Sequence, residues 1–112
     1  MASMNESMRI LQGVLMRQLR KLHDKLDDVT DADVAEAIVR EMQEVNHRIA
    51  LTGSLLFSAQ AAELDARVSA IDKATSRVNR AIADIQNLQA FLGAISEFLG
   101  LVDEAIDLAK TL

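Results

Sequence analysis

The fold class of this chain is decided in its C-terminal segment, LQAFLGAISEFLGLVDEAIDLAKTL, residues 88–112. Two apolar series run through it at spacings of three and four residues, the period of one helix face. The first series contains Leu88, Leu92, Ile95, Leu99, Val102 and Ile106. The second, displaced by about 100° around the helix, contains Phe91, Ala94, Phe98, Leu101, Ala105, Leu108 and Leu112. The pattern predicts a helix over residues 88–110 with two apolar sides.

A helix with two apolar sides needs cover on both of them. It either lies at the centre of its own bundle or forms part of an oligomer interface. We interpret the second series as a protein interface, with these candidate residues: Phe91, Ala94, Phe98, Leu101, Ala105, Leu108 and Leu112. The chain is therefore expected to form a homo-oligomer, with a dimer favoured, through helix packing of the coiled-coil kind.

Earlier in the chain, apolar residues at helical spacing predict helices over about residues 5–27 and 31–51. The boundary between them is DDVTDADV, residues 27–34. Thr30 is the predicted N-cap of the second helix, and Val29 and Val34 are expected to pack across it as a hydrophobic staple.

The stretch IALTGSLLFSAQAA, residues 49–62, carries no charge. A membrane-spanning helix needs about 20 apolar residues, so this run is too short and too polar to span. We read Thr52-Gly53-Ser54 as a turn, with Gly53 after one helix and Ser54 capping the next. The competing reading is an unbroken helix through Gly53, at a cost of about 1 kcal/mol. Under the first reading a third helix covers residues 54–86, and it either breaks at Asn87 or continues into the fourth.

These elements predict an all-α protein: one domain, residues 1–112, built as an antiparallel bundle of three or four helices with a long C-terminal helix. The absence of Pro, Trp and Tyr agrees with this class. A net charge of -5 argues against nucleic-acid binding. The chain has no Cys for a disulfide or a thiol nucleophile. The first fifteen residues include Asn5, Glu6 and Arg9 and do not read as a signal peptide. We therefore expect a cytoplasmic protein, with export by a signal-independent route left open.

One short motif raises the question of metal chemistry. Glu44-Val45-Asn46-His47 has the Glu-x-x-His spacing found in di-metal helical bundles. It occurs once, and helix geometry turns Glu44 and His47 about 120° and 160° away from the apolar stripe, towards solvent. No Gly-x-Ser-x-Gly turn is present to expose a nucleophile. We expect no catalytic residue, cofactor or metal site, and a di-metal enzyme is the least favoured alternative.

The sequence therefore favours a non-enzymatic helical module for protein–protein interaction: a small adaptor, chaperone-like, regulatory or structural subunit. The first alternative is a membrane-active or pore-associated protein that uses the uncharged segments 49–62 and 85–96. Basic residues at helical spacing are read as a solvated helix face, with contact to an acidic partner or nucleic acid as the minor reading. They are Arg17, Arg20, Lys21 and Lys25.

Overall fold

Four α-helices make up the fold. The computed structural model describes residues 4–112, which contain α1 (Glu6–Leu26), α2 (Ala32–Ser54), α3 (Ala62–Ala83) and α4 (Leu88–Thr111), and no strand. The prediction of an all-α bundle is confirmed.

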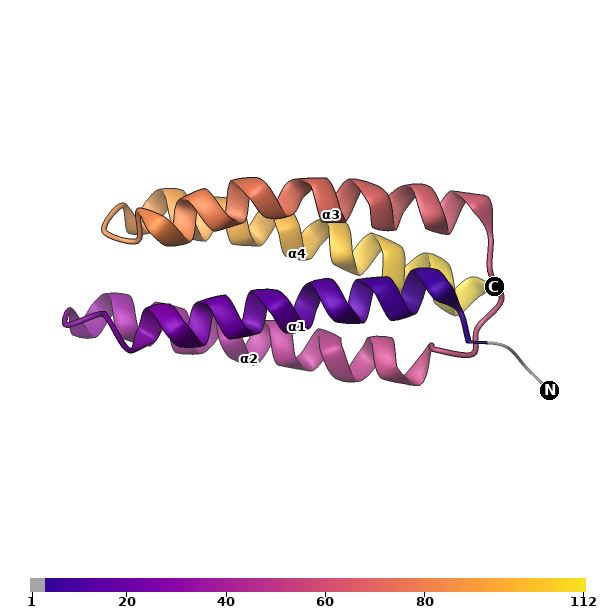
Figure 1. Cartoon of the computed structure of the whole chain (residues 1–112), viewed down its shortest axis with the longest axis horizontal. Helices are drawn as coiled ribbons and strands as arrows, with labels where there is room; N and C mark the ends of the chain where they lie inside the picture. The colour runs from indigo at the N-terminus through magenta and orange to yellow at the C-terminus, as the bar shows by residue number, and fades with distance from the viewer. Residues whose placement is uncertain (1–3) are drawn as a thin grey trace.

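The helices form two antiparallel hairpins, α1/α2 and α3/α4, that lie side by side along the long axis of the molecule (Figure 1). The bundle measures 49 × 21 × 17 Å. Between the hairpins, α1 packs on α3 and α2 packs less extensively on α4. Although α2 and α3 are consecutive in sequence, they occupy opposite corners of the bundle.

The core draws large apolar side chains from all four helices. The largest fully buried ones are Met8, Leu11, Leu15, Leu22, Ile38, Leu64, Ile71, Phe91, Ile95, Phe98 and Ile106. Each contributes about 1.5–3 kcal/mol of hydrophobic stabilisation relative to exposure. Both apolar series of α4 enter this core, through Ile95 on the first and Phe98 on the second. The helix with two apolar sides is thus covered by helices of its own chain.

Two of the three predicted connections between helices lie close to those observed. The break at Asn87 is real, because Asn87 caps α4 by accepting a hydrogen bond from the Ala90 amide at 3.2 Å. The predicted N-cap at Thr30 was wrong by one residue. Asp31 caps α2 instead, and its carboxylate accepts hydrogen bonds from the amides of Asp33 and Val34. A carboxylate is also stabilised by the positive end of the helix dipole, which a hydroxyl is not.

The predicted turn at Thr52-Gly53-Ser54 was wrong, and the competing reading is correct in that the helix runs through Gly53. The start of the third helix, predicted over residues 54–86, was also wrong, because α3 begins eight residues later at Ala62. Helix α2 continues through Ser54, and the connection lies at residues 55–61. The Thr52 hydroxyl donates back to the Ile49 carbonyl and the Ser54 hydroxyl to the Leu51 carbonyl, each at 2.7 Å. The hydroxyls therefore bond within their own helix and do not cap the next one.

The linker at 55–61 is held by a residue far away in sequence. Asn5 is fully buried, and its amide nitrogen donates to the carbonyls of Ser58 and Ala59 at 3.1 and 3.0 Å. Its side-chain oxygen accepts from the Met8 amide and caps α1. One side chain thus fixes both the start of α1 and the path of the linker.

Candidate functional site

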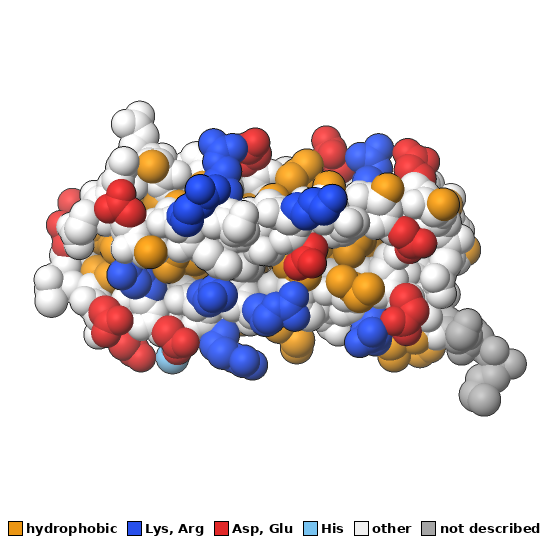
Figure 2. Space-filling model, turned by 45° about the horizontal axis from the view of Figure 1, so that its top comes forward, with side chains coloured by type: hydrophobic (Ala, Val, Ile, Leu, Met, Phe, Trp, Pro, Cys, Tyr) orange, Lys and Arg blue, Asp and Glu red, His pale blue; other side chains and the backbone are white. Residues whose placement is uncertain are grey.

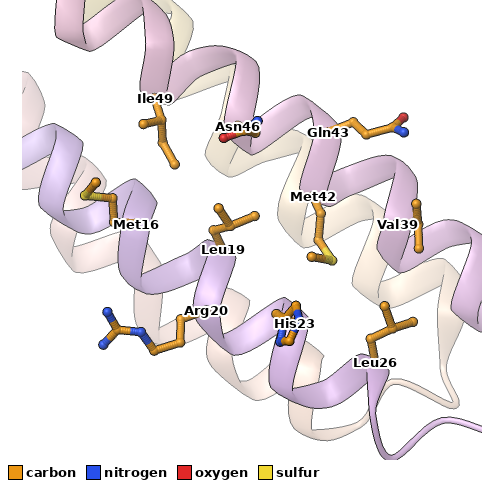
Figure 3. A pocket seen from close by; sticks show the side chains of 10 residues that line it. All are labelled: Met16, Leu19, Arg20, His23, Leu26, Val39, Met42, Gln43, Asn46 and Ile49. Carbon is orange, nitrogen blue, oxygen red and sulfur yellow. The ribbon is translucent and has the colours of Figure 1, made fainter.

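An open groove follows the outer side of the α1/α2 hairpin (Figure 3). Its volume is about 660 Å³. The residues that line it are Met16, Leu19, Arg20, His23, Leu26, Val39, Met42, Gln43, Asn46 and Ile49. We call this feature the α1/α2 groove.

The same residue spacing on two antiparallel helices produces the groove. On each helix the lining positions advance by three, four and three residues, which places them on one side of the helix. The positions are Met16, Leu19, His23 and Leu26 on α1, and Val39, Met42, Asn46 and Ile49 on α2. Leu26 and Val39 lie at one end of the groove, and Met16 and Ile49 lie at the other (Figure 3).

The floor and the edges of the α1/α2 groove differ in exposure. Leu19, Leu26, Met42 and Ile49 are partly buried and pack against the bundle core. Met16 and Val39 stand at the edges and are 50% and 41% exposed. These two are large apolar side chains that the chain leaves uncovered next to an apolar floor.

The lining contains four polar side chains, and none of them is acidic. They are Arg20 and His23 on α1, and Gln43 and Asn46 on α2, with no Asp or Glu. Within residues 4–112, Arg20 makes no ion pair and no side-chain hydrogen bond. The one formal charge in the lining is therefore that of Arg20, whose side chain extends from the edge of α1 on the side away from α2 (Figure 3), although the chain as a whole carries -5.

The contact between α1 and α2 contains no ion pair among the described residues. Each of the other packed helix pairs has at least one ion pair across it: Arg17–Asp72 between α1 and α3, Arg48–Asp103 between α2 and α4, and Arg67–Glu104 and Arg77–Glu97 between α3 and α4. In the part of the chain that the structure describes, no ion pair or side-chain hydrogen bond joins α1 to α2. This hairpin is therefore held mainly by the packing of apolar side chains.

The charged groups of α2 gather on its other side, facing α4. The Arg48 guanidinium donates to both carboxylate oxygens of Asp103, at 2.8 and 3.0 Å, and to Glu44 at 2.9 Å. The hydrogen bond to Asp103, and then the one to Glu44, raise the pKa of Arg48 against the opposing effect of its burial. Burial, assisted by the charge of Glu44, raises the pKa of the neighbouring Glu41 carboxyl.

The interface residues predicted from the sequence lie mainly inside the single chain. Phe91, Ala94, Phe98 and Ala105 are buried in the core. Leu101 and Leu108 are partly buried, and only Leu112, at 45%, is exposed. Covering by α2 and α3 accounts for the apolar character of this series without a second chain, and the predicted interface at these residues stays a prediction.

The other residues singled out from the sequence lie at the surface. Glu44 and His47 are exposed, as helix geometry predicted, and His23 is exposed on α1. Among residues 4–112, no three His, Asp or Glu side chains gather in a way that would hold a metal ion. No helix in the same range has the length and apolar character needed to cross a membrane.

Sequence reasoning missed the α1/α2 groove because Leu19, Leu26, Met42 and Ile49 belong to the apolar series from which the first two helices were predicted, and such a series usually faces a core. A signal was present on the outer side of α2, where positions at helical spacing carry no charge at all. They are Ala35, Val39, Met42, Asn46, Ile49, Ala50 and Gly53. A solvated helix face normally carries charged residues there.

Comparisons with protein-family descriptions, with characterised proteins and with solved structures found no match to this chain. Its function is therefore inferred from its own side chains and their arrangement.

Proposed function

We propose that this chain is a non-enzymatic protein–protein interaction module, which binds its partner by packing a helix against the α1/α2 groove. The observation that carries the proposal is the groove itself, an apolar channel of about 660 Å³ open to solvent. Contiguous apolar surface that a chain leaves uncovered usually marks an interaction site. Grooves between helices are a common receptor for an amphipathic helix.

The composition of the groove suits protein binding. Met16 and Met42 have unbranched, flexible side chains that adjust to the shape of a partner surface. Leu19, Leu26 and Ile49, which pack against the core, supply the rest of the apolar floor. A partner side chain that fills the channel would remove both the floor and the exposed edges from water, and apolar burial of this kind drives most protein association.

The groove lining also lacks the groups that nucleophilic catalysis requires. It contains one imidazole, that of His23, but no Ser, Thr, Cys, Asp or Glu. A nucleophile is usually activated by a base that is itself oriented by a third group. This composition supports binding as the role of the groove.

One observation favours the alternative of a membrane-active protein. Phe57 is 65% exposed and lies in the uncharged linker at residues 55–61. Aromatic side chains of this kind insert readily at a bilayer interface. Flotation with anionic and neutral liposomes tests the alternative: co-flotation that Phe57→Ser abolishes would support it, and recovery of all the protein in the aqueous fraction would exclude it.

The proposed function is tested by site-specific photo-crosslinking in the cells that normally make the protein. A photoreactive phenylalanine analogue replaces Val39, at the edge of the groove, and a control variant carries it at Ser76, which is exposed on α3. We expect discrete adducts from position 39 and none of the same size from position 76. The same adducts should disappear when Met16→Glu is added.

The masses of the adducts identify the kind of partner. An adduct of twice the chain mass of 12.3 kDa means a second copy, which is the homo-oligomer expected from the sequence. A larger or smaller adduct of fixed mass means a different protein. Identical, diffuse products from positions 39 and 76, unchanged by Met16→Glu, would contradict the proposed function.

A further inference from the structure

We infer that the partner of the α1/α2 groove supplies an amphipathic helix with an acidic side chain placed opposite Arg20. The inference rests on the proposed function and specifies the chemistry of the partner. Shape, charge and the composition of the rest of the chain each bear on it.

The length of the groove fits a short helix. Met16 and Leu26 are ten residues apart on α1, and Val39 and Ile49 are ten apart on α2. At about 1.5 Å per residue, this distance is roughly 15 Å, or close to three helical turns. A helix laid along the channel would present apolar side chains at positions i, i+3 or i+4, and i+7 to the floor.

The charge of the groove indicates an acidic partner. Six of the arginines in residues 4–112 make an ion pair, and Arg20 and Arg80 do not. Arg80 lies on α3, away from the groove, whereas Arg20 lines it. An acidic residue on the partner would meet an unpaired guanidinium and no carboxylate of the lining. Complementary charge of this kind selects partners and orients them.

A second copy of this chain is a poor occupant of the groove. If two grooves faced each other, the only formal charges in the two linings would be the two Arg20 guanidinium groups, with no carboxylate from either lining to pair with them. The other large apolar side chains that the described part of the chain exposes do not form a helical stripe. They are Met4, Ile10, Phe57 and Leu112, each in a different segment. These exposed side chains therefore do not form an apolar helix stripe that a second copy could lay in the groove.

The inference is tested with three synthetic peptides of about five helical turns. The first carries a Leu/Ile stripe at i, i+3, i+7, i+10 and i+14 with Glu residues beside it. The second has the same stripe with Lys in place of Glu, and the third has the Glu composition with the stripe scrambled. Binding is followed by fluorescence anisotropy and by the ε-methyl NMR signals of the full-length protein.

We expect the Glu peptide to bind and to shift the methyl signals of Met16 and Met42, which lie in the groove. The signal of Met8, fully buried in the core, should not move. The Lys peptide should bind about threefold to tenfold more weakly, the range expected for exchanging an attractive exposed charge pair for a repulsive one. The scrambled peptide should not bind.

Two matched variants locate the charge effect. Arg20→Glu should reverse the preference in favour of the Lys peptide, and Arg80→Glu should leave it unchanged. Both side chains are exposed and outside the core, so neither variant should lose its helical circular dichroism.

Several results would overturn the inference. Equal binding of the Glu and Lys peptides, or the same response to Arg20→Glu and Arg80→Glu, would mean that the partner is not selected by acidic charge. Failure of both striped peptides to shift Met16 and Met42 would mean that the groove does not receive a helix. The first result leaves the proposed function standing, whereas the second removes its helix-packing mode. Crosslinking at Val39 tests independently whether any partner protein occupies the groove.

Discussion

The two helical hairpins differ in what lies over the contact between their helices: ion pairs on α3/α4 and an open apolar groove on α1/α2. On the α3/α4 hairpin, Arg67 pairs with Glu104 at 3.3 Å and Arg77 pairs with Glu97 at 2.7 Å. The face seen in Figure 2, where α3 is turned towards the viewer, has charges of both signs between scattered hydrophobic side chains. The α1/α2 hairpin has no such pair across it in the described residues, and its outer side is the open groove.

The ion pairs across the α3/α4 hairpin add little to the stability of the fold. Exposed ion pairs such as Arg77–Glu97 contribute only about 0–1 kcal/mol. What they do is place charged groups over the junction of two helices, which makes that surface a poor site for an apolar partner. The α1/α2 hairpin lacks this cover along about three helical turns, so it retains the surface that a partner helix can bury.

The largest expected effect is that of removing a core side chain from the α3/α4 hairpin. Phe98 is 1% exposed, and Phe98→Ala should lower the free energy of unfolding by about 3–5 kcal/mol. Urea denaturation followed by circular dichroism measures this, and the loss should not depend on protein concentration. A loss below about 1 kcal/mol would mean that Phe98 is not packed in the core of the single chain. That result would support its predicted role in an interface.

A smaller effect is expected where α2 meets α4. The Arg48 side chain is only 13% exposed, and Asp103→Ala would leave its guanidinium without its bidentate partner. The free energy of unfolding should fall by about 1–3 kcal/mol. Glu97→Ala removes the exposed pair with Arg77 and should cost at most about 1 kcal/mol. Equal losses in the two variants would contradict the distinction between a partly buried ion pair and an exposed one.

The raised pKa of Glu41 on α2 should make the stability of the fold depend on pH. The pKa of Glu41 is raised in the folded state, mainly by burial, so its protonated form is the one that folding favours. Its contribution to stability is fully present below the unfolded pKa and is lost as the pH rises through the folded pKa. Glu41→Gln should therefore be more stable than the parent at pH 7, by no more than about 0.5 kcal/mol because the group is partly solvated. Melting temperatures should converge near pH 4 and below, and the opposite trend would refute the assignment.

A similarly small effect on stability is expected for each substitution in the α1/α2 groove. Met16 and Val39 are half-exposed, so the double change Met16→Gln and Val39→Gln should alter the free energy of unfolding by no more than about 0.5 kcal/mol per site. The same change should abolish binding of the striped acidic peptide. A loss of several kcal/mol on thermal or urea unfolding would show that the two side chains serve the fold and not a partner.

Local patterns in the sequence were enough to predict the helices. The helical periods of the apolar residues and the cap at Asn87 were sufficient for the all-α class and for two of the three connections between helices, within a few residues. The linker at 55–61 was not predictable in this way, because the contacts of Asn5 with Ser58 and Ala59 join residues more than 50 positions apart.

The candidate site escaped prediction for a related reason. Periodicity shows that Leu19 and Met42 lie on apolar helix faces, but it does not show whether another helix covers the outer edge of each face. Conversely, Phe91 and Phe98 looked available for a second chain until α2 and α3 were seen to cover them. Which apolar face stays open depends on the arrangement of the helices, which local patterns do not specify.

The most direct test of the account is the solvent exposure of individual methionine methyl groups in the free protein. A soluble paramagnetic agent broadens the ε-methyl signals that water can reach. The account predicts strong broadening for Met16, intermediate broadening for Met42 and none for Met8, which are respectively 50% exposed, partly buried and 0% exposed. If Met16 and Met42 are as protected as Met8, the groove is already filled in solution, and the claim that the α1/α2 hairpin keeps an open surface for a partner is wrong.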